Sequence, residues 1–339
     1  MKPSLFRLQN IIISRTDSIG DVVLTLPLAK LVKETYPHIK VAFLGRAYTK
    51  PVIDACTYID QFIDIEDFLK QEILIDGKPP QAIIHVFPVK EIAHRAKAIG
   101  IPWRIGTTNR LYHWTTCNKR VRLSRKKSDL HEAQLNAKLL APLALTSSYN
   151  LQRLGDAMGM TRLQPLPTAF QDLLDPDRYR LILHPKSQGS AREWGLDHFI
   201  SLVNILPLQQ FQIFISGTAK ERESLQYLFK EVGDRVTDIT GKMDLSTFIS
   251  FIDACDGLVA NSTGPLHISA ALGKKAIGIY PPIRPMHPGR WQPLGKNATY
   301  SVVPKDCNDC RKDPGACHCI REVLPQQIAG LLIDDACLK

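Results

Sequence analysis

Near residue 260 the chain reads Gly257-Leu258-Val259-Ala260-Asn261-Ser262-Thr263-Gly264-Pro265-Leu266-His267. The first four residues are typical of a buried strand, and the apolar pattern after Pro265 is typical of a helix. A polar turn before a helix forms an anion site, because the first N–H groups of the helix have no partner within it. Gly264 permits close approach of a phosphate, and Pro265 suits the first helical turn. The stretch predicts a site for a phosphate-bearing ligand, and an ordinary, well-capped turn is the alternative.

The same alternation of short apolar runs with longer amphipathic runs extends along most of the chain. It predicts βα units built around parallel sheets. The strands expected on this basis are 11–14, 41–44, 82–87, 181–184, 212–216, 257–260 and 276–280. The helices expected between them include 21–35, 89–98, 196–206, 219–232, 245–254 and 266–272.

Two successive series of such units predict an α/β protein with two domains. A chain of 339 residues is also longer than the chains that usually fold around a single hydrophobic core. We expect an N-terminal domain at 1–165, a C-terminal domain at 178–325 and a tail or helix at 326–339. The pattern fades around residues 146–178, where three prolines mark a linker. A ligand site in the cleft between the two halves is the usual arrangement in such proteins.

Composition limits the class of protein and its partners. Hydrophobic residues make up 44% of the chain, which is ordinary for globular domains. No apolar run approaches the roughly 20 residues of a membrane span. The N-terminus leads straight into a strand without a signal peptide, so we expect a cytoplasmic protein. The formal net charge of +10 favours anionic partners.

Much of the positive charge lies in the run 119–127, which includes Arg120 and Arg122. Such a run is often a solvated loop, and it also suits contact with an anionic acceptor or with lipid headgroups. Nucleic acid is the least favoured partner, because the run has no interleaved aromatic residues and no nucleic-acid-binding motif accompanies it.

A carboxylate follows the first expected strand. Asp21 lies where this strand gives way to a helix, at the edge of the sheet where α/β proteins keep their chemistry. Gly20 leaves room for a substrate, so Asp21 could act as a general base on a hydroxyl group. Capping of the helix is the alternative for Asp21, and Asp17 is a second candidate for either role.

Two loops of the second half carry groups that suit a nucleotide. The loop after the strand 181–184 contains Ser187, Gln188 and Arg192, and a guanidinium there could hold a diphosphate with two hydrogen bonds. A solvated Arg192 on a surface loop is the alternative. After the next strand, Glu221 could accept hydrogen bonds from ribose hydroxyls or complement a helix dipole.

Together these motifs resemble those of glycosyltransferase family 9, the group that contains the ADP-heptose:lipopolysaccharide heptosyltransferases. The resemblance is carried by residues 14–27, His131-Glu132, 190–194, 217–221 and 261–267. These segments span nearly the whole chain in the family's order, so their combination is much more specific than any one motif.

The resemblance implies a GT-B fold, in which two Rossmann-like domains with parallel sheets face each other across a cleft. It also implies an inverting transfer of a sugar from a nucleotide diphosphate to an acceptor hydroxyl, with no metal or other cofactor required. The implied donor is ADP-heptose, bound by the second domain. The implied acceptor is the lipopolysaccharide core or a related anionic glycolipid, met through peripheral contact with the inner face of the cytoplasmic membrane.

The resemblance also assigns roles by position. Asp21 matches the family's proposed catalytic base. The positions assigned to the donor are Ser187, Gln188, Arg192, Glu221, Ser262, Thr263, Gly264 and His267. Those assigned to the acceptor are Arg15, Asp17, Arg120 and Arg122. Two positions depart from the family pattern, because Ser262 replaces an aspartate found in many heptosyltransferases and Arg192 replaces a lysine.

Four cysteines gather near the C-terminus, with the spacing C-x2-C-x6-C-x-C. They are Cys307, Cys310, Cys317 and Cys319. Four thiolates this close could hold a structural zinc ion, although the second pair is spaced more tightly than the usual knuckle. Free or redox-labile thiols are the alternative interpretation.

Two other functions fit the same architecture. A nucleotide-sugar epimerase of the GT-B type would turn over its substrate with no acceptor present. A non-catalytic nucleotide- or glycan-binding protein would need no general base, so Asp21 argues against it.

Overall fold

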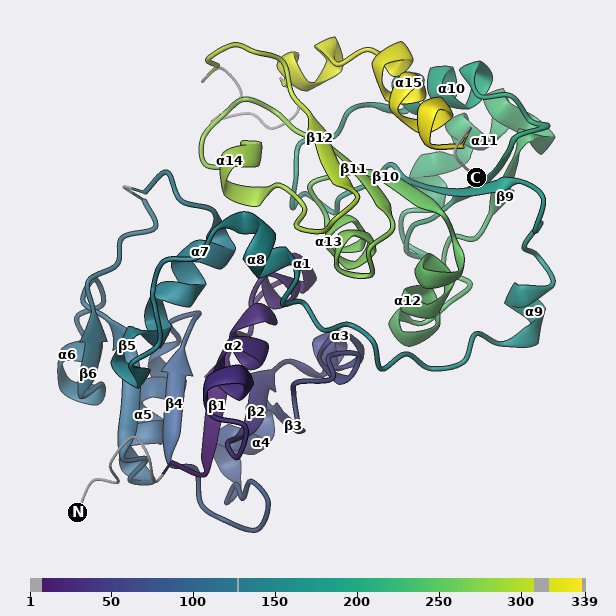
Figure 1. The fold of residues 1–339 in the computed structure, drawn as a ribbon. Helices are drawn as coiled ribbons and strands as arrows, with labels where there is room; N and C mark the ends of the chain where they lie inside the picture. The colour runs from purple at the N-terminus through teal and green to yellow at the C-terminus, as the bar shows by residue number, and fades with distance from the viewer. Residues whose placement is uncertain (1–7, 127, 308–316, 337–339) are drawn as a thin grey trace. The chain divides into compact units, whose positions relative to one another are not determined.

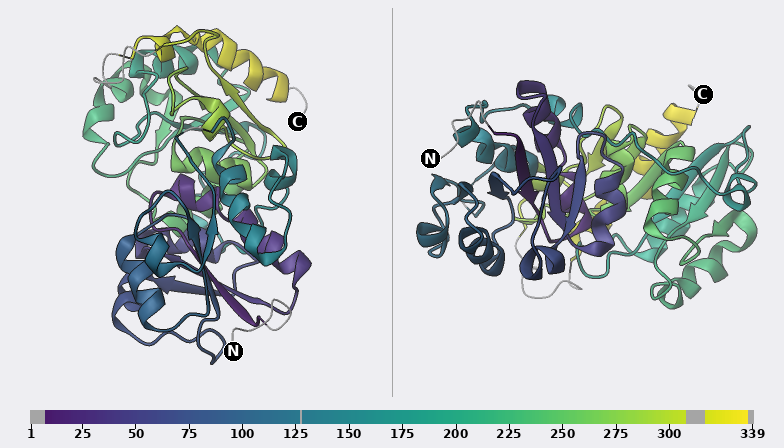
Figure 2. Two further views of the ribbon diagram at one scale, coloured as in Figure 1. Left: turned by 90° about the vertical axis from the view of Figure 1, so that its left-hand side faces the viewer. Right: turned by 90° about the horizontal axis from the view of Figure 1, so that it is seen from below.

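The computed structural model of the chain describes residues 8–126, 128–307 and 317–336. The chain divides into two compact units, Met1–Arg162 and Leu163–Lys339. Each unit is built on a six-stranded parallel sheet against which helices pack (Figures 1 and 2). No helix in these described ranges is long and apolar enough to cross a membrane.

The first unit has the strand order β3-β2-β1-β4-β5-β6. Its strands are β1 (Asn10–Ser14), β2 (Lys40–Gly45), β3 (Gln61–Asp64), β4 (Ala82–His85), β5 (Trp103–Thr107) and β6 (Lys119–Val121). Its α-helices are α1 (Ile19–Val23), α2 (Pro27–Thr35), α3 (Lys50–Asp54), α4 (Ile65–Lys70), α5 (Lys90–Ala98), α6 (His113–Thr116), α7 (Glu132–Ala137) and α8 (Leu151–Gly155). Short 3₁₀ helices occupy Ala47–Thr49 and Lys138–Leu143.

The second unit has the order β12-β11-β10-β7-β8-β9. Its strands are β7 (Tyr179–His184), β8 (Phe211–Ile215), β9 (Val236–Asp238), β10 (Gly257–Asn261), β11 (Lys275–Ile279) and β12 (Ala298–Ser301). Its α-helices are α9 (Thr168–Gln171), α10 (Leu196–Ile205), α11 (Gln226–Val232), α12 (Leu245–Ala254), α13 (Gly264–Ala271), α14 (Pro288–Trp291) and α15 (Pro325–Ala336). Short 3₁₀ helices occupy Glu223–Leu225, Gly233–Arg235 and Cys319–Glu322.

Both units have the same topology. In each unit the fourth strand along the chain pairs with the first strand. The strand order therefore reverses between β1 and β4 in the first unit and between β7 and β10 in the second. Ligands of open α/β sheets bind beside the carboxyl ends of the strands at such a switch point. The central strands are wholly buried, as their unbroken apolar runs predict. The topology therefore offers one ligand-binding position in each unit.

Several elements differ from those expected from the sequence. The single helix expected at 21–35 is two helices, α1 and α2, because Pro27 has no N–H to continue the first one. A solvated loop was one interpretation of the basic run, but the run begins as the edge strand β6. Glu221 was expected at a helix start, yet it lies in a turn that precedes the short 3₁₀ helix at Glu223–Leu225.

Candidate active site

In the first unit, Asp21 lies beside the switch point between β1 and β4. β1 ends at Ser14, and a short loop leads to α1 (Figure 1). The N-cap of α1 is Ser18, so Asp21 sits within the first turn and is not the cap residue. The Ser18 hydroxyl donates a hydrogen bond to the Asp21 carboxylate. Asp21 remains 16% exposed and open to a substrate.

A buried guanidinium organises the carboxylates at this position. Arg15 Nε donates to Asp17 Oδ1 at 2.7 Å, and Arg15 Nη1 donates to Glu132 Oε1 at 2.9 Å. The third nitrogen, Nη2, donates to Asp21. Burial opposes the charge of Arg15, but Asp21, Asp17 and Glu132 outweigh this and raise its pKa. Arg15 therefore keeps its charge and fixes the orientation of Asp21.

The two aspartates near Arg15 differ in their surroundings. Burial, and then the charge of Asp21, raises the pKa of Asp17 to about 6 against the opposing effect of Arg15. The Asp17 carbonyl also accepts a hydrogen bond from the Tyr48 hydroxyl at 2.5 Å. The raised pKa keeps Asp17 a candidate base beside Asp21.

A second layer of polar groups supports Arg15 from α7. Arg125 Nε donates to Glu132 Oε1 at 2.9 Å, and Arg125 Nη2 donates to Asn136 Oδ1 at 2.8 Å. Asn136 Nδ2 donates to the Leu24 carbonyl at 3.2 Å, which ties α7 to the end of α1. His131 caps α7 by accepting from the Ala133 N–H. The His131-Glu132 motif therefore builds the support for Arg15. Arg125 comes from the basic run 119–127 considered for acceptor contact, and Asn136 is a member that sequence reasoning missed.

The remaining acceptor candidates lie apart from this network. Arg120 belongs to the edge strand β6, where its guanidinium covers the Trp114 ring at 4.7 Å. Its Nη1 donates to the Cys117 carbonyl at 2.9 Å. Arg122 follows β6 and has an exposed side chain. The basic residue that joins the network of Arg15 is Arg125, not Arg120 or Arg122.

In the second unit, two loops meet at the switch point between β7 and β10. Asn261, at the end of β10, is fully buried and joins them. Its Oδ1 accepts from the Trp194 N–H at 2.9 Å, and its Nδ2 donates to the Pro185 carbonyl at 2.8 Å. The residues after β7 and the residues after β10 are thereby held side by side.

The loop after β7 is a tight polar turn. Gln188 and Gly189 both have positive φ angles, 49° and 79°. The Ser187 N–H donates to Glu193 Oε1 at 3.0 Å, and Lys186 Nζ lies 2.5 Å from Glu193 Oε2. Glu193, which sequence reasoning did not assign, therefore closes the turn. Arg192 is 6% exposed, so the solvated Arg192 that the sequence allowed is wrong.

Thr218 links this loop to Glu221. Gln188 Nε2 donates to Thr218 Oγ1 at 3.2 Å, and the Thr218 N–H donates to Glu221 Oε2 at 2.8 Å. Nearby, the buried His184 contacts Ser216 Oγ at 2.9 Å through Nδ1. Burial lowers the pKa of His184 to about 4, although Glu221 and Glu193 oppose it. The ring is therefore neutral beside these carboxylates.

The first residues of α13 provide unpaired donors. Thr263 is the N-cap, but its side chain makes no cap hydrogen bond. Its hydroxyl is buried and has no partner among the described residues. His267, one turn into the helix, is also buried. Ser262 hydrogen-bonds to the hydroxyl of Tyr280, the residue after β11. This region therefore suits an anionic group, as the sequence predicts.

Three of the four cysteines considered for zinc lie in the described ranges, whereas Cys310 lies outside them. Burial, and then a hydrogen bond with Cys307, raises the pKa of the Cys319 thiol to about 11. Within residues 8–126, 128–307 and 317–336, no group of three or more His, Cys, Asp or Glu side chains is arranged to hold a metal ion.

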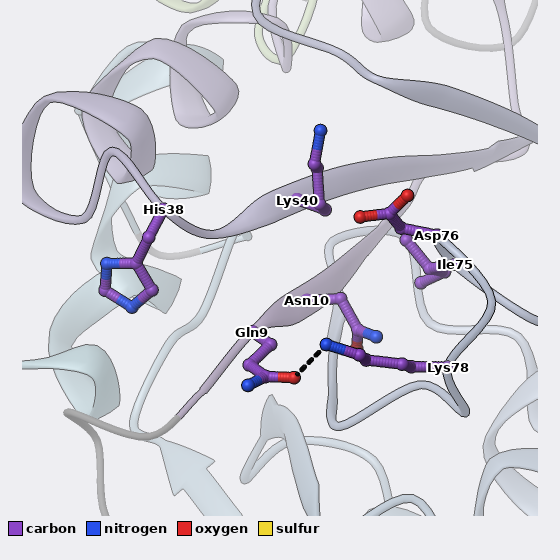
Figure 3. A pocket seen from close by; sticks show the side chains of 7 residues that line it. All are labelled: Gln9, Asn10, His38, Lys40, Ile75, Asp76 and Lys78. Carbon is purple, nitrogen blue, oxygen red and sulfur yellow. Dashed lines mark hydrogen bonds between the residues drawn. The ribbon is translucent and has the colours of Figure 1, made fainter.

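One further pocket lies at the amino-terminal edge of the first sheet. Figure 3 shows the starts of β1 and β2, with Lys78 Nζ donating to Gln9 Oε1 at 2.8 Å. Asn10 and Lys40 mark the first residues of these strands. This edge is opposite to the one that carries Asp21, where the chemistry of such sheets takes place. The pocket is therefore not part of the candidate active site.

Comparison with known proteins identifies the family. The sequence profile of glycosyltransferase family 9 (heptosyltransferase) matches residues 93–320. A Haemophilus influenzae protein with a provisional glycosyltransferase assignment is 26% identical over 305 residues, which cover 85% of this chain and 86% of that protein.

Solved structures of the family share the fold. The glycosyl transferase family 9 protein from Veillonella parvula has a TM-score of 0.82 at 17% identity, covering 100% of this chain and 99% of the other. The Escherichia coli ADP-heptose lipopolysaccharide heptosyltransferase II has a TM-score of 0.73 at 17% identity, covering 98% and 99%. The chain is therefore a glycosyltransferase with the GT-B fold, and it belongs to glycosyltransferase family 9.

Proposed function

We propose that the enzyme transfers heptose from ADP-heptose to the lipopolysaccharide core or a related anionic glycolipid, with inversion at the anomeric carbon. The observation that carries this proposal is the Asp21 carboxylate held by buried Arg15 beside the first switch point. Membership of family 9 favours transfer over the epimerase and the non-catalytic alternatives. ADP-heptose is the choice of donor because a structural neighbour acts on it.

The donor diphosphate binds at the start of α13 in the second unit. Backbone N–H groups, the Thr263 hydroxyl and His267 face the phosphates, and Arg192 adds a charge that is already desolvated. Such preorganised donors stabilise the negative charge that develops on the leaving diphosphate. Further donor contacts come from the remaining candidates of this unit, Ser187, Gln188, Glu221, Ser262 and Gly264, with Glu221 directed to the ribose.

The acceptor binds at the first unit. Asp21 removes the proton from the acceptor hydroxyl as its oxygen forms a bond to the anomeric carbon. The bond from that carbon to the diphosphate breaks, and ADP leaves with the electron pair. Arg15 holds one oxygen of Asp21 so that the carboxylate keeps the angle required for proton transfer. Asp17 lines the acceptor site, and Arg120 and Arg122 contact anionic groups of the glycolipid.

The enzyme works at the inner face of the cytoplasmic membrane and needs no metal ion for the transfer step. The negative charge of the leaving group is met by Arg192 and the α13 N-terminus. The two departures from the family pattern bear on the donor. The planar guanidinium of Arg192 can donate two parallel hydrogen bonds, whereas a lysine ammonium is a point charge. Ser262 places a neutral hydroxyl, in place of a carboxylate, beside Tyr280.

A donor screen followed by an acceptor test would examine the proposal. Thermal melting is measured with ADP-, GDP- and UDP-sugars, since a ligand that binds the folded state raises the melting temperature. ADP-heptose should give the largest shift, and release of ADP should require a heptose-accepting glycolipid. Turnover of the nucleotide sugar without acceptor would instead establish an epimerase. A larger shift with a GDP- or UDP-sugar would refute the assignment of the donor.

A further inference from the structure

Two large apolar side chains project from one flank of the first unit. Leu111 is 88% exposed and Trp114 is 56% exposed, and Leu111 is the most exposed large hydrophobic residue in the described part of the chain. They lie in the loop after β5 and on α6, beside the edge strand β6 (Figure 1). Exposed leucine and tryptophan this close together cost free energy in water unless something covers them.

The loop that carries them is firmly folded, so their exposure is built into the structure. The Trp114 N–H donates to the Leu111 carbonyl at 3.0 Å, and the indole Nε1 donates to the Thr108 carbonyl at 3.1 Å. His113, between them, is buried and accepts from the Thr107 N–H through Nδ1 at 3.0 Å. The indole N–H is thus already satisfied, so the exposed part of the side chain needs no further hydrogen-bond partner.

Cations surround this apolar pair. Arg110 precedes Leu111 and is exposed, and the Arg120 guanidinium covers the Trp114 ring at 4.7 Å. Residues 92–128 contain ten Lys and Arg and no Asp or Glu, so this segment alone accounts for the formal net charge of +10. The apolar pair therefore sits in a long segment of the chain where positive charge is not balanced by carboxylates.

We propose that Arg110, Leu111 and Trp114 form a docking surface for an anionic lipid bilayer, here named the Leu111 surface, which extends the membrane location given under the proposed function. Leu111 and Trp114 enter the headgroup region, where tryptophan is favoured, while Arg110 contacts lipid phosphates. Apolar insertion combined with basic charge is the pair of signals that gives stable peripheral attachment. Nucleic acid fits less well, because Leu111, the more exposed of the two apolar side chains, offers no aromatic surface for base stacking.

The test uses the full chain and vesicles of phosphatidylcholine with or without phosphatidylglycerol. Vesicle co-sedimentation and tryptophan fluorescence are measured without donor or acceptor, so the result does not depend on the proposed function. Binding should require phosphatidylglycerol and weaken with salt. The double variant Leu111→Ser, Trp114→Ser should lower the partition coefficient by about tenfold or more, since two apolar anchors are lost. Arg110→Gln should weaken binding severalfold, mainly at low salt.

Matched controls separate this surface from other exposed groups and from the acceptor site. Leu324→Ser and Tyr227→Ser remove side chains that are 53% and 52% exposed in the second unit, and they should leave vesicle binding unchanged. Trp114→Phe should abolish the fluorescence shift seen on vesicle binding.

Two results would overturn the inference. One is vesicle binding that the Leu111→Ser, Trp114→Ser variant retains in full. The other is a loss of transfer to a lipid-free acceptor fragment in that variant, which would make the surface a glycan contact.

Discussion

The two units of this enzyme share one strand order, yet they carry opposite chemistry at the carboxyl ends of their central strands. The first unit places carboxylates around a buried Arg15, with Asp21 open to a substrate. The second places the N-terminus of α13, the buried Thr263 hydroxyl and the buried Arg192 at the equivalent position. The same topology therefore presents two different sets of side chains, because the loop residues after the central strands differ between the units.

The largest expected effect comes from removing the organising charge of the first unit. Arg15→Met leaves Asp17, Asp21 and Glu132 without their shared partner in a buried site. Breaking a buried ion pair in this way costs about 3–5 kcal/mol, so the free energy of unfolding measured with urea should fall by that order. Transfer should be lost as well. The affinity for ADP, which we assign to the second unit, should persist in the protein that remains folded.

A matched variant makes this result specific. Arg153→Met removes an exposed arginine that pairs with Glu34 in the same unit. Exposed pairs contribute about 0–1 kcal/mol, so this variant should remain stable and active. Equal destabilisation by the two variants would show that Arg15 has no special place in the first unit.

Acid should reveal a second difference between the units. Burial, and then His113 and Arg104, lowers the pKa of His85 to about 3, from an ordinary value near 6.5. The unfolded chain then binds a proton that the folded chain does not, so stability is complete above pH 6.5 and falls between pH 6.5 and 3. The loss reaches roughly 5 kcal/mol near pH 3, at about 1.36 kcal/mol for each pH unit between the two pKa values. Asp17 offsets part of this loss of stability. Its pKa is raised in the folded chain, so the folded state binds more protons and gains stability as the pH falls from about 6 toward 3.8.

Urea unfolding measured as a function of pH checks this prediction. His85→Leu should flatten the loss below pH 6.5 more than His184→Leu, because the pKa of His184 is lowered only to about 4. An unchanged pH dependence in His85→Leu would mean that this ring does not take up its proton on unfolding.

Some of this comparison could be predicted from the sequence and some could not. The apolar runs within β1, β7 and β10 and the polar turns after them could be predicted from the sequence, whereas the strand order that makes these positions switch points came from the structure. The edge strand β6 was missed because its residues, Lys119 to Val121, are largely polar and only partly buried. The role of Arg15 was also invisible, because its partner Glu132 is 117 positions away and only folding brings them together.

A smaller effect should follow from removing the guanidinium of the second unit. Arg192→Ala should weaken ADP binding by about 2 kcal/mol, or roughly 30-fold, as expected for a lost charge-assisted contact. Isothermal titration with ADP measures this directly. Arg222→Ala serves as the control, since Arg222 is 57% exposed and pairs with Asp238 at 2.9 Å. Unchanged ADP affinity in Arg192→Ala would remove this residue from the donor site.

The smallest effect is expected at the exposed arginines of the first unit. Arg120→Gln combined with Arg122→Gln should raise the KM for an acceptor fragment severalfold, because exposed ion pairs contribute about 1 kcal/mol or less. The KM for the donor should stay the same, and the effect should shrink with salt. Steady-state kinetics measure both constants, and the double variant Lys50→Gln, Lys70→Gln is the control. Equal KM values for the acceptor in the two double variants would contradict this prediction.

The division of chemistry between the units is tested most directly by the single-turnover rate of Asp21→Asn at saturating ADP-heptose and acceptor. Asparagine keeps the shape of the side chain and can still accept from Arg15, but it cannot take up the acceptor proton. We predict that the rate falls by roughly 10²–10⁴-fold while ADP affinity and the melting temperature remain those of the wild type. Asp54→Asn, at an exposed position of α3, should retain the full rate. A near-normal rate in Asp21→Asn would contradict the assignment of Asp21 as the base and transfer that role to Asp17.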